Sequence, residues 1–430
     1  MFQEQIKVDI QDLIKGMYVC KLDRPWIETP FPFQGFYVSS TKDIKILNSY
    51  CRYVYVDIVR GKTPAVRSSN SNMQWKTVTN AGRRIPKPVN IRVRSSFYKP
   101  AISFKKELKK APELFQDLQI ATNQLAADLK VGMAPDLSAT RKSSEAMVSS
   151  IIRNPDVFVW LSRLEGHDAS GYNHSVRASV WATFFGRHLG LSEEKLNDLS
   201  LGVLLCDIGN TKLSRQLLQR TDNFNEDELQ RIQSHVQYGV DILENCGGVP
   251  DRVISIVANH HERFDGSGYG RGLAGDQIPL LARIAGIVDS YEAMTNPRAH
   301  RKALTPAQAL EVLFEQRGRM YQAQLIEEFI QAVGIYPSGS AVRLNTGEVG
   351  VVISHNFHTR LRPEIACTHN SEGDKYPNPK IIDLSTIKNS GFEISIHSAL
   401  PIDAIDIDLQ QIHEQYITKK LNWGFFKFSA

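Results

Sequence analysis

The spacing of apolar residues changes twice along the chain and divides it into segments of different predicted structure. Within residues 1–61, runs of β-branched and aromatic residues at 6–8, 18–22 and 52–57 predict short strands. The run at 43–47 predicts one or two turns of helix between them. We therefore expect residues 1–61 to form a small mixed α/β module with an accessory or regulatory role.

Residues 102–337 show the three- and four-residue apolar spacing of amphipathic helices. A helix predicted over 107–130 ends at Gly132, and a later helix begins with the cap signal Ser192 before Glu193. Further helices are predicted over residues 170–189, 193–206, 226–244, 252–261, 279–294, 306–317 and 322–333. Because no convincing strand interrupts this series, we expect a single all-α domain.

After residue 337 the apolar period changes to two. Residues 341–344 and 348–353 flank the turn at 345–347, which predicts a β-hairpin. The β-type pattern continues to about residue 400. Residues 338–430 are therefore predicted to form a small β-rich appendage and tail, and the complete chain is predicted to be multidomain around its central helical domain.

The charge distribution identifies the segment between the first module and the helices. The net charge is +5, but residues 62–106 contain eleven Lys or Arg and no Asp or Glu, so the remainder carries −6. Such a block can bind nucleic acid or anionic lipid. The low-complexity run at 68–72, with Pro86 and Pro88, instead favours a solvated basic linker over residues 62–101.

Several classes of protein are disfavoured by the composition. No apolar run approaches the roughly 18 residues of a membrane-spanning helix. The beginning of the chain, Met1 to Gln5, lacks the pattern of a signal peptide. The five scattered cysteines include no Cys-x-x-Cys pair, which argues against a disulfide framework or a zinc finger. These observations predict a soluble cytoplasmic protein.

The first candidate for chemistry is the adjacent pair His260 and His261. It is followed by Glu262 and by a loop with glycines at 266, 268 and 270. Imidazole is the commonest transition-metal ligand, and a neighbouring acid commonly orients it. Glycine allows a sharp turn and a close backbone approach. Taken alone, the segment is equally compatible with a helix that ends in a Gly-rich cap and carries two half-exposed histidines.

Other polar residues in the helical region strengthen the metal interpretation. Seven of the twelve histidines lie between residues 167 and 300, including His174 and His235 near the beginnings of predicted helices. Asp207 and Asp289 each follow an apolar run and are therefore expected to be buried, which is costly for a carboxylate without a partner or a metal. Clusters of Asp and His suit iron, manganese or zinc, and paired ions suit hydrolysis of phosphate esters.

Three segments of the helical domain resemble the HD-GYP family, a bacterial branch of the HD-domain metal phosphohydrolases that cleaves cyclic di-GMP. They are residues 233–243, 260–272 and 278–301, and the resemblance extends over roughly residues 140–335. Residues 1–61 and the β appendage are similar to segments that often flank this catalytic domain. The resemblance implies an HD-type helical fold with a metal centre.

The resemblance also implies particular site residues. The implied metal ligands are His174, Asp207, His235, His260, His261 and Asp289, with Asp207 bridging two ions. The implied substrate contacts are Arg298 and Arg301, at basic positions that hold phosphates, and the loop residues Gly266, Gly268 and Tyr269. Guanidinium groups suit this role because they bind phosphate oxygens in pairs.

The chain departs from the family pattern in ways that affect the site. The family has His in place of Cys206, Lys in place of Asn210, Pro in place of Gly270 and Asp in place of Glu292, and some members have a Glu ligand in place of Ser170. Cys206 is a further candidate metal ligand, and its thiolate would favour zinc or iron over manganese; the alternative is an inert buried thiol beside a lost metal site. Asn210 lacks a positive charge near the scissile phosphate, a loss that typically slows the reaction about 10²- to 10³-fold. Gly270 is expected only to loosen its loop.

We therefore expect a metal-dependent phosphodiesterase that hydrolyses cyclic di-GMP to linear pGpG or to GMP, weakened by Cys206 and Asn210. Asp207 and Asn210 are its expected catalytic residues. Its expected cofactors are two divalent ions of iron or manganese, with zinc also compatible and fewer ions if the site is degenerate. One alternative is an inactive cyclic di-GMP receptor, or an adaptor that docks a diguanylate cyclase (GGDEF) protein through residues 266–270. Another is a phosphohydrolase of a different nucleotide, because fold does not fix substrate.

Overall fold

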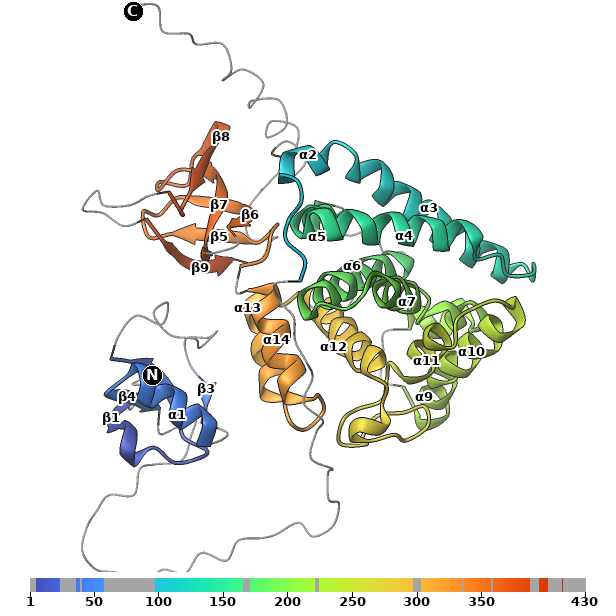
Figure 1. Ribbon diagram of the computed structural model, residues 1–430, viewed down its shortest axis with the longest axis horizontal. Coiled ribbons are helices and arrows are strands. Elements are labelled where there is room, and N and C mark those ends of the chain that lie inside the picture. The colour runs from blue at the N-terminus through green and yellow to red at the C-terminus, as the bar shows by residue number, and fades with distance from the viewer. Residues whose placement is uncertain are drawn as a thin grey trace, which may run out of the picture. The chain divides into compact units, whose positions relative to one another are not determined.

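Figure 1 shows the computed structural model of the chain. It describes residues 5–23, 36–38, 41–57, 97–164, 171–220, 224–296, 303–334, 336–356, 359–386, 394–400 and 412. The chain forms two compact units, Met1–Ile85 and Pro86–Ala430. Most of the predicted basic linker, residues 62–96, lies outside the described residues. The four-part division of the chain at residues 61, 101 and 337 stays a prediction.

The first unit contains an antiparallel sheet with the strand order β1-β4-β2-β3. Its elements are β1 (Gln5–Asp9), η1 (Ile10–Asp12), β2 (Tyr18–Leu22), β3 (Phe36–Tyr37), α1 (Thr41–Tyr50) and β4 (Tyr53–Asp57). Side chains alternate along β4, so that Val54 and Val56 are buried while Tyr53 and Tyr55 on the opposite face are partly exposed. The small mixed module expected at the beginning of the chain is confirmed.

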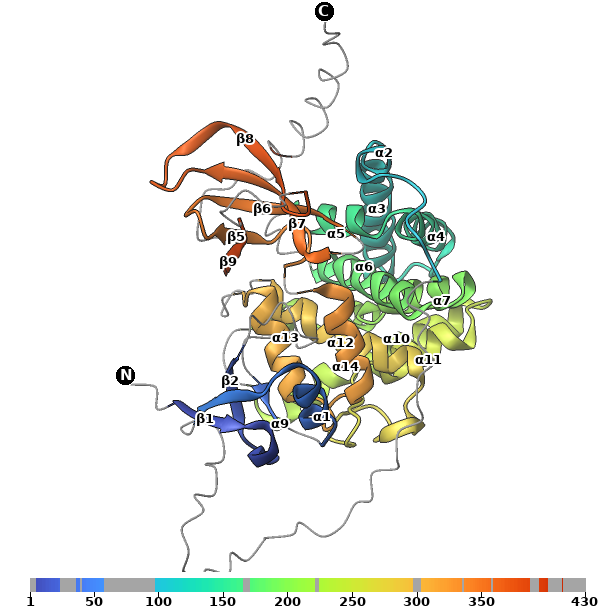
Figure 2. The same cartoon turned by 60° about the vertical axis from the view of Figure 1, so that its left-hand side comes forward.

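The second unit begins with helices (Figures 1 and 2). They are α2 (Phe104–Leu108), α3 (Ala111–Lys130), α4 (Ser138–Arg153), α5 (Pro155–Leu164), α6 (Gly171–Leu189), α7 (Glu193–Leu204), α8 (Arg215–Gln219), α9 (Glu226–Gln233), α10 (His235–Cys246), α11 (Asp251–Asn259), α12 (Leu280–Thr295), α13 (Pro306–Glu315) and α14 (Ala323–Val333). Two short 3-10 helices, η3 (Ile208–Lys212) and η4 (Gly275–Gln277), lie between them. The prediction of a mostly helical central domain is confirmed.

Two predicted helices are divided in the structure. Pro112 lies in the first turn of α3, where a helix needs no N–H donor, so residues 107–130 belong to two helices. The residues predicted as one helix over 226–244 are divided between α9 and α10 at Ser234. The Ser234 hydroxyl donates a hydrogen bond to the Arg231 carbonyl at 2.6 Å. Local hydrogen bonding of this kind competes with a continuous helix.

Helices α4 and α5 are not predicted by the apolar pattern. The inward face of α4 buries Thr140, Ser144 and Ser150 among its apolar residues. The Ser144 hydroxyl lies 2.6 Å from that of Ser200 on α7, so small polar side chains satisfy one another inside the domain. Buried serine and threonine therefore conceal the amphipathic period by which a helix is recognised.

The packing of α7 on α11 brings together the residues that follow these two helices. Gly202 of α7 faces Ile256 of α11, and a Cβ atom at Gly202 would lie 2.6 Å from the Ile256 Cδ1 atom. Leu205, Leu243 and Val257 belong to one core cluster that joins α7, α10 and α11. The segments after α7 and α11 consequently meet beside α6 and α12, which pack against them.

A second antiparallel sheet follows the helices, with the strand order β8-β7-β6-β5-β9. Its strands are β5 (Ala341–Leu344), β6 (Val349–Asn356), β7 (Thr359–His369), β8 (Lys375–Asp383) and β9 (Ile396–Leu400). Ala341 lies opposite Val351, which confirms the predicted hairpin. Within the part of the chain that the structure describes, no helix is both long and apolar enough to cross a membrane.

Candidate metal centre

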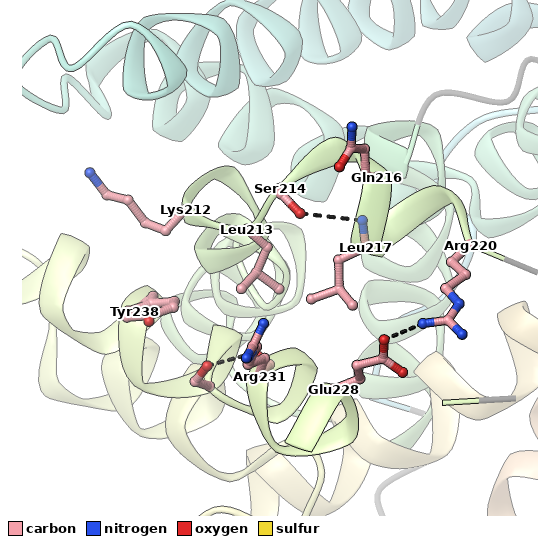
Figure 3. A pocket seen from close by; sticks show the side chains of 10 residues that line it. Lys212, Leu213, Ser214, Gln216, Leu217, Arg220, Glu228, Arg231 and Tyr238 are labelled. Atoms are coloured by element: carbon pink, nitrogen blue, oxygen red, sulfur yellow. Dashed lines mark hydrogen bonds and ion pairs between the residues drawn. The ribbon is translucent and has the colours of Figure 1, made fainter. Parts of the chain in front are cut away.

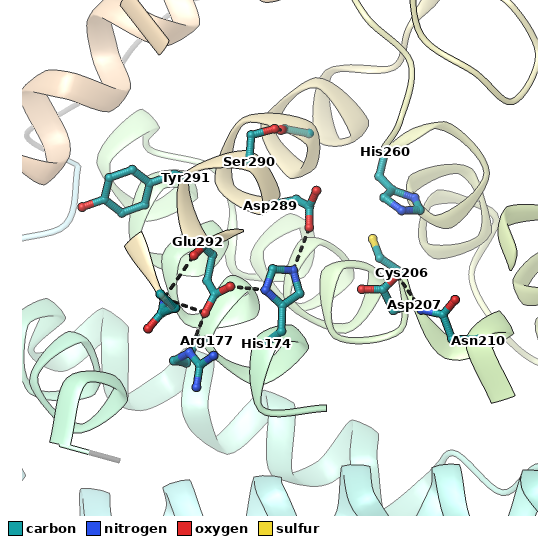
Figure 4. Close-up of polar contacts among 12 residues, drawn as sticks. His174, Arg177, Cys206, Asp207, Asn210, His260, Asp289, Ser290, Tyr291 and Glu292 are labelled. Carbon is teal, nitrogen blue, oxygen red and sulfur yellow. Dashed lines mark hydrogen bonds and ion pairs between the residues drawn. The ribbon is translucent and has the colours of Figure 1, made fainter. Parts of the chain in front are cut away.

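Six side chains expected to be metal ligands converge in the helical domain, and Figure 4 shows four of them. They lie in the first turn of α6 (His174), after α7 (Asp207), at the beginning of α10 (His235), after α11 (His260 and His261) and in α12 (Asp289). They form two groups of three, within each of which the potential ligating atoms lie within 4.8 Å of one another: the histidine group His235, His260 and His261, and the mixed group His174, Asp207 and Asp289. Asp207 Oδ1 lies 3.6 Å from His235 Nε2, so the two groups adjoin.

Backbone hydrogen bonds orient the histidine group. His235 Nδ1 lies 2.7 Å from the Ile232 carbonyl oxygen, and His260 Nδ1 lies 2.8 Å from that of Val257. Since a carbonyl oxygen only accepts, each Nδ1 carries the proton and each Nε2 carries the lone pair. Both Nε2 atoms are buried, and neither has a hydrogen-bond partner among the described residues. Unpartnered buried nitrogens of this kind are suited to bind a cation.

Two members of the histidine group, His260 and His261, are also kept uncharged by their surroundings. Burial lowers the pKa of His260 below its ordinary value. Burial, followed by the electrostatic effect of His260, lowers the pKa of His261. The ring centroids of these two histidines are 4.0 Å apart. Both imidazoles are therefore neutral near pH 7, which is the form that coordinates a metal.

The mixed group is held by carboxylates. His174 Nε2 lies 2.9 Å from Asp289 Oδ1, and His174 Nδ1 contacts the carboxylate of Glu292 (Figure 4). The buried Glu292 carboxylate also accepts hydrogen bonds from Arg177 Nε at 2.5 Å and from Asn296 Nδ2 at 2.8 Å. Burial alone would lower the pKa of His174, but Glu292 and Asp289 raise it well above its ordinary value. Glu292 therefore fixes the orientation of the His174 ring.

The expectation that Asp207 and Asp289 are buried is confirmed only in part, because both side chains are half-buried. Their side chains are 28% and 21% exposed. The apolar residues before Asp207, such as Leu205, face the core, but α7 ends at Leu204 and the chain then turns. At Asp207 the apolar run therefore predicts the burial of the helix that contains it, and not that of the polar residue that follows the helix.

Two of the departures from the family pattern lie beside Asp207. The buried Cys206 thiol donates a hydrogen bond to the Gly202 carbonyl at 3.2 Å and belongs to neither group of potential ligands. Burial, followed by the effect of Asp207, raises the pKa of the Cys206 thiol well above its ordinary value, so it stays protonated. The Asn210 amide donates a hydrogen bond to Asp207 Oδ1 at 3.1 Å.

The Gly-rich loop folds back on the adjacent histidines. The Tyr269 ring stacks on that of His261, with centroids 4.5 Å apart and an interplanar angle of 23°. The Glu262 carboxylate accepts hydrogen bonds from the backbone N–H groups of Arg271 and Leu273, so Glu262 holds the loop. A Cβ atom at Gly268 would lie 2.3 Å from the His261 carbonyl oxygen, a distance that only glycine avoids.

One expectation about this loop needs correction. Gly270 has a φ of 124°, whereas proline fixes φ near −65°. The backbone at Gly270 is therefore one that the family's proline could not adopt, and glycine does more than loosen the loop. Gly266 likewise has a positive φ of 79°. Both conformations are in the region where glycine is favoured over other residues.

Other site residues lie outside this arrangement or outside the predictions. Arg298, Arg301 and Ser170 are not among the described residues. Sequence reasoning did not identify Arg177 and did not assign an orienting role to Glu292. Each lies three residues after a predicted ligand, His174 or Asp289, and therefore on the same helix face, which is a signal that could have indicated both.

A separate cleft of about 470 Å³ lies between the η3–α8 and α9–α10 segments (Figure 3). It is lined by Lys212, Leu213, Ser214, Gln216, Leu217, Arg220, Glu228, Arg231, Ser234 and Tyr238. None of the six residues of the two groups is part of this lining, and Arg220 contacts Glu228 across it. The cleft is therefore distinct from the candidate metal centre.

Three known domain families match parts of the chain. Residues 162–325 match the family described as "HD domain". Residues 5–140 match a domain of unknown function, DUF3391, and residues 341–391 match a "KOW domain associated with HD domain". The HD-domain match contains every residue of the two groups of potential ligands.

Individual relatives agree with the family match. The cyclic di-GMP phosphodiesterase PA4108 of Pseudomonas aeruginosa is 29% identical over 394 residues, which are 90% of this chain and 92% of that protein. The cyclic di-GMP phosphodiesterase response regulator RpfG of Xanthomonas campestris is 33% identical over 156 residues, 36% of this chain and 41% of that protein. A solved structure, Bd1817, an HDG"Y"P protein from Bdellovibrio bacteriovorus, is 15% identical with a TM-score of 0.45 and covers 76% of this chain and 99% of that one. Residues 162–325 of the chain therefore match an HD domain, and most of the chain is similar to a cyclic di-GMP phosphodiesterase.

Proposed function

We propose that this chain is a metal-dependent phosphodiesterase that hydrolyses cyclic di-GMP to linear pGpG or to GMP in bacterial second-messenger signalling. The observation that carries the proposal is the convergence of six potential ligands from five separate segments into two adjoining groups. The name of the Pseudomonas relative, which aligns over most of this chain, supports the same substrate. Paired metal sites of this composition suit hydrolysis of a phosphodiester.

The donor atoms fit divalent transition metals. The buried Nε2 atoms of His235 and His260 lack a partner among the described residues, and the carboxylates of Asp207 and Asp289 supply oxygen donors nearby. Mixed imidazole and carboxylate donors suit iron, manganese or zinc. When bound, such ions would stabilise negative charge on the phosphate and lower the pKa of a water that attacks phosphorus. We propose that the two groups hold one ion each, with Asp207 between them.

The residues around the six ligands prepare them for this role. Hydrogen bonds to backbone carbonyls fix His235 and His260 with their lone pairs on Nε2, as described above. Glu292 orients His174, and Asn210 orients the Asp207 carboxylate. Because His235 and His260 are held before a cation arrives, little reorganisation of these two ligands is needed on binding.

Substrate binding and product formation rest on residues near the same centre. We propose that Arg298 and Arg301 bind the phosphates of cyclic di-GMP through paired guanidinium hydrogen bonds. Asn210 offers a neutral donor in place of a lysine, so negative charge at the phosphate is less stabilised and turnover is slower. The loop residues Gly266, Gly268 and Tyr269 are proposed to border the bound nucleotide.

The retained site favours this hydrolase over a receptor without activity. A receptor without activity would not need oriented metal ligands. Four of the six potential ligands are nevertheless oriented by polar contacts, namely His174, Asp207, His235 and His260. Docking of a diguanylate cyclase through residues 266–270 stays a prediction. Tyr269, which belongs to that loop, is engaged in stacking on His261.

The test is hydrolysis of cyclic di-GMP by the purified full chain in the presence of Mn²⁺ or, without oxygen, Fe²⁺. Products are separated chromatographically, and cyclic di-AMP and 3′3′-cGAMP serve as competing substrates. We expect turnover of cyclic di-GMP that is lost in Asp207→Ala. A folded protein with metal bound and no turnover would contradict the proposal, and preferential cleavage of another nucleotide would change its substrate.

A further inference from the structure

The two groups of potential ligands differ in what a cation must displace. In the histidine group, His235 Nε2 and His260 Nε2 are buried and have no hydrogen-bond partner among the described residues. Their rings are already oriented through Nδ1. A cation entering here gains donors without breaking a protein hydrogen bond to either nitrogen.

In the mixed group the imidazole is already engaged on both sides. His174 Nε2 lies 2.9 Å from Asp289 Oδ1, and His174 Nδ1 contacts Glu292. A cation must separate His174 from Asp289 before both can ligate it. The loss of one charge-assisted hydrogen bond corresponds to a change in affinity of about tenfold or more. The Asp207 and Asp289 carboxylates are also partly exposed, so they lose hydration when they bind.

The donor types favour the same group. The histidine group offers three imidazoles, whereas the mixed group offers one imidazole and two carboxylates. Imidazole nitrogen suits borderline ions such as Co²⁺ and Zn²⁺ better than carboxylate oxygen does. Cys206 does not compensate, because its thiol is directed to the Gly202 carbonyl and belongs to neither group.

We propose that this chain binds one transition-metal ion tightly in the histidine group and a second ion at least about tenfold more weakly in the mixed group. The inference rests on the proposed function only in that these six residues are metal ligands. It adds that the two positions fill in sequence, so that a form with one ion is populated at low metal concentration. The weaker affinity of the mixed group then determines what fraction of the protein carries two ions.

Titration of the metal-free full chain with Co²⁺ tests the inference, because visible absorption of Co²⁺ reports its ligands and can be followed without substrate. We expect one Co²⁺ per chain retained through gel filtration and a second seen only with excess metal. Two ions retained with equal affinity in the wild-type chain would overturn the inference. This two-step titration decides the question even if a variant fails to fold.

Two variants identify which group holds which ion. We expect His260→Gln to lose the tightly bound Co²⁺ and Asp289→Asn to lose only the weakly bound one. His397→Gln is the matched control, because His397 is an exposed residue of β9 in the second sheet and should leave both steps unchanged. Loss of the tight ion in Asp289→Asn, with its retention in His260→Gln, would reverse the assignment and overturn the inference.

Hydrolysis of cyclic di-GMP is measured on the same samples to separate this inference from the proposed function. Sequential binding of Co²⁺ without turnover under any metal would leave the inference standing and remove the phosphodiesterase. Turnover by a chain whose two sites fill equally would support the phosphodiesterase and overturn the inference of sequential metal binding.

Discussion

The Asn210 amide donates a hydrogen bond to Asp207 Oδ1 at 3.1 Å, beside the junction of the two groups of potential ligands. The family resemblance implies a lysine at the position of Asn210, where it would bring positive charge to the substrate phosphate. Asn210 itself orients a carboxylate without contributing charge. Asn210 therefore keeps the Asp207 carboxylate oriented, while the positive charge of a lysine is missing from the site.

Replacing Asn210 by lysine is expected to raise kcat/KM for cyclic di-GMP. One preorganised electrostatic contact to a phosphate typically changes the rate by about 10²- to 10³-fold. Because the lysine variant also loses the hydrogen bond to Asp207, we expect a smaller net gain in kcat/KM, of at least about tenfold. Asn210→Ala removes the bond without adding charge and should lower the rate. Steady-state kinetics of the wild type and both variants measure these changes, and a folded lysine variant no faster than the wild type would refute the prediction.

Replacing Glu292 by glutamine is expected to weaken both the fold and the metal centre. The buried contacts of Glu292 to His174 and Arg177 would lose their negative charge, and breaking a buried ion pair typically costs about 3–5 kcal/mol of the free energy of unfolding. Loss of a residue that orients a ligand typically lowers metal affinity about 10- to 100-fold. Denaturant unfolding and Co²⁺ titration measure the two effects.

The matched control for Glu292→Gln is Glu328→Gln. Glu328 contacts His188 at 3.1 Å between α14 and α6, outside both groups of potential ligands. This variant should lower stability while leaving Co²⁺ affinity unchanged. Equal losses of Co²⁺ affinity in the two variants would show that Glu292 acts through general stability and not through His174.

Replacing Gly268 by alanine is expected to displace the loop from the adjacent histidines. Its Cβ atom would meet backbone atoms of His261 and Arg263 at 2.3 and 2.5 Å. Overpacking of this kind costs about 1–3 kcal/mol. Gly272→Ala is the control, because a Cβ atom there has open space, although its φ of 68° is unfavourable for alanine. A Gly268 variant as stable and active as the Gly272 variant would contradict this account of the loop.

Replacing Glu107 by glutamine tests a prediction about pH. Burial alone would raise the pKa of Glu107, but hydrogen bonds from Arg153 and Ser150 lower it below its ordinary value of 4.5. A carboxyl group with a depressed pKa stabilises the folded state above its unfolded pKa and loses this effect as pH falls through the folded pKa. At pH 7 the variant should be less stable by about 1.5–3 kcal/mol.

The difference between wild type and Glu107→Gln should therefore shrink as pH falls below about 4.5. Denaturant unfolding at a series of pH values measures this change. A difference that stays constant between pH 7 and pH 3 would show that the Glu107 charge is not the source of the stabilisation.

The residues that could be predicted from the sequence are those with a periodic or positional signal. Apolar and polar side chains alternate along β4, and a turn that contains a glycine joins β5 and β6, so the strand and the hairpin were both predictable. α4 was not, because its buried serines and threonine imitate a polar face. Single-sequence patterns record hydrophobicity, and they do not record hydrogen bonds formed between buried hydroxyls.

The same distinction applies to the candidate metal centre. The ligands could be located because His260 and His261 follow an apolar helix and because the family resemblance aligned the rest. The orienting contacts of Glu292 and Asn210, and the direction of the Cys206 thiol, could not be predicted. They depend on side-chain rotamers that only the packing of α6, α7 and α12 determines.

The most direct test of the central claim is the rate of cyclic di-GMP hydrolysis by the folded full chain before metal removal, after chelation, and after Mn²⁺ is restored. We predict that turnover is lost on chelation and recovered with Mn²⁺, and that Asp207→Ala shows no recovery. Turnover that persists in the chelated protein, or that Asp207→Ala retains, would contradict a phosphodiesterase centred on these six residues.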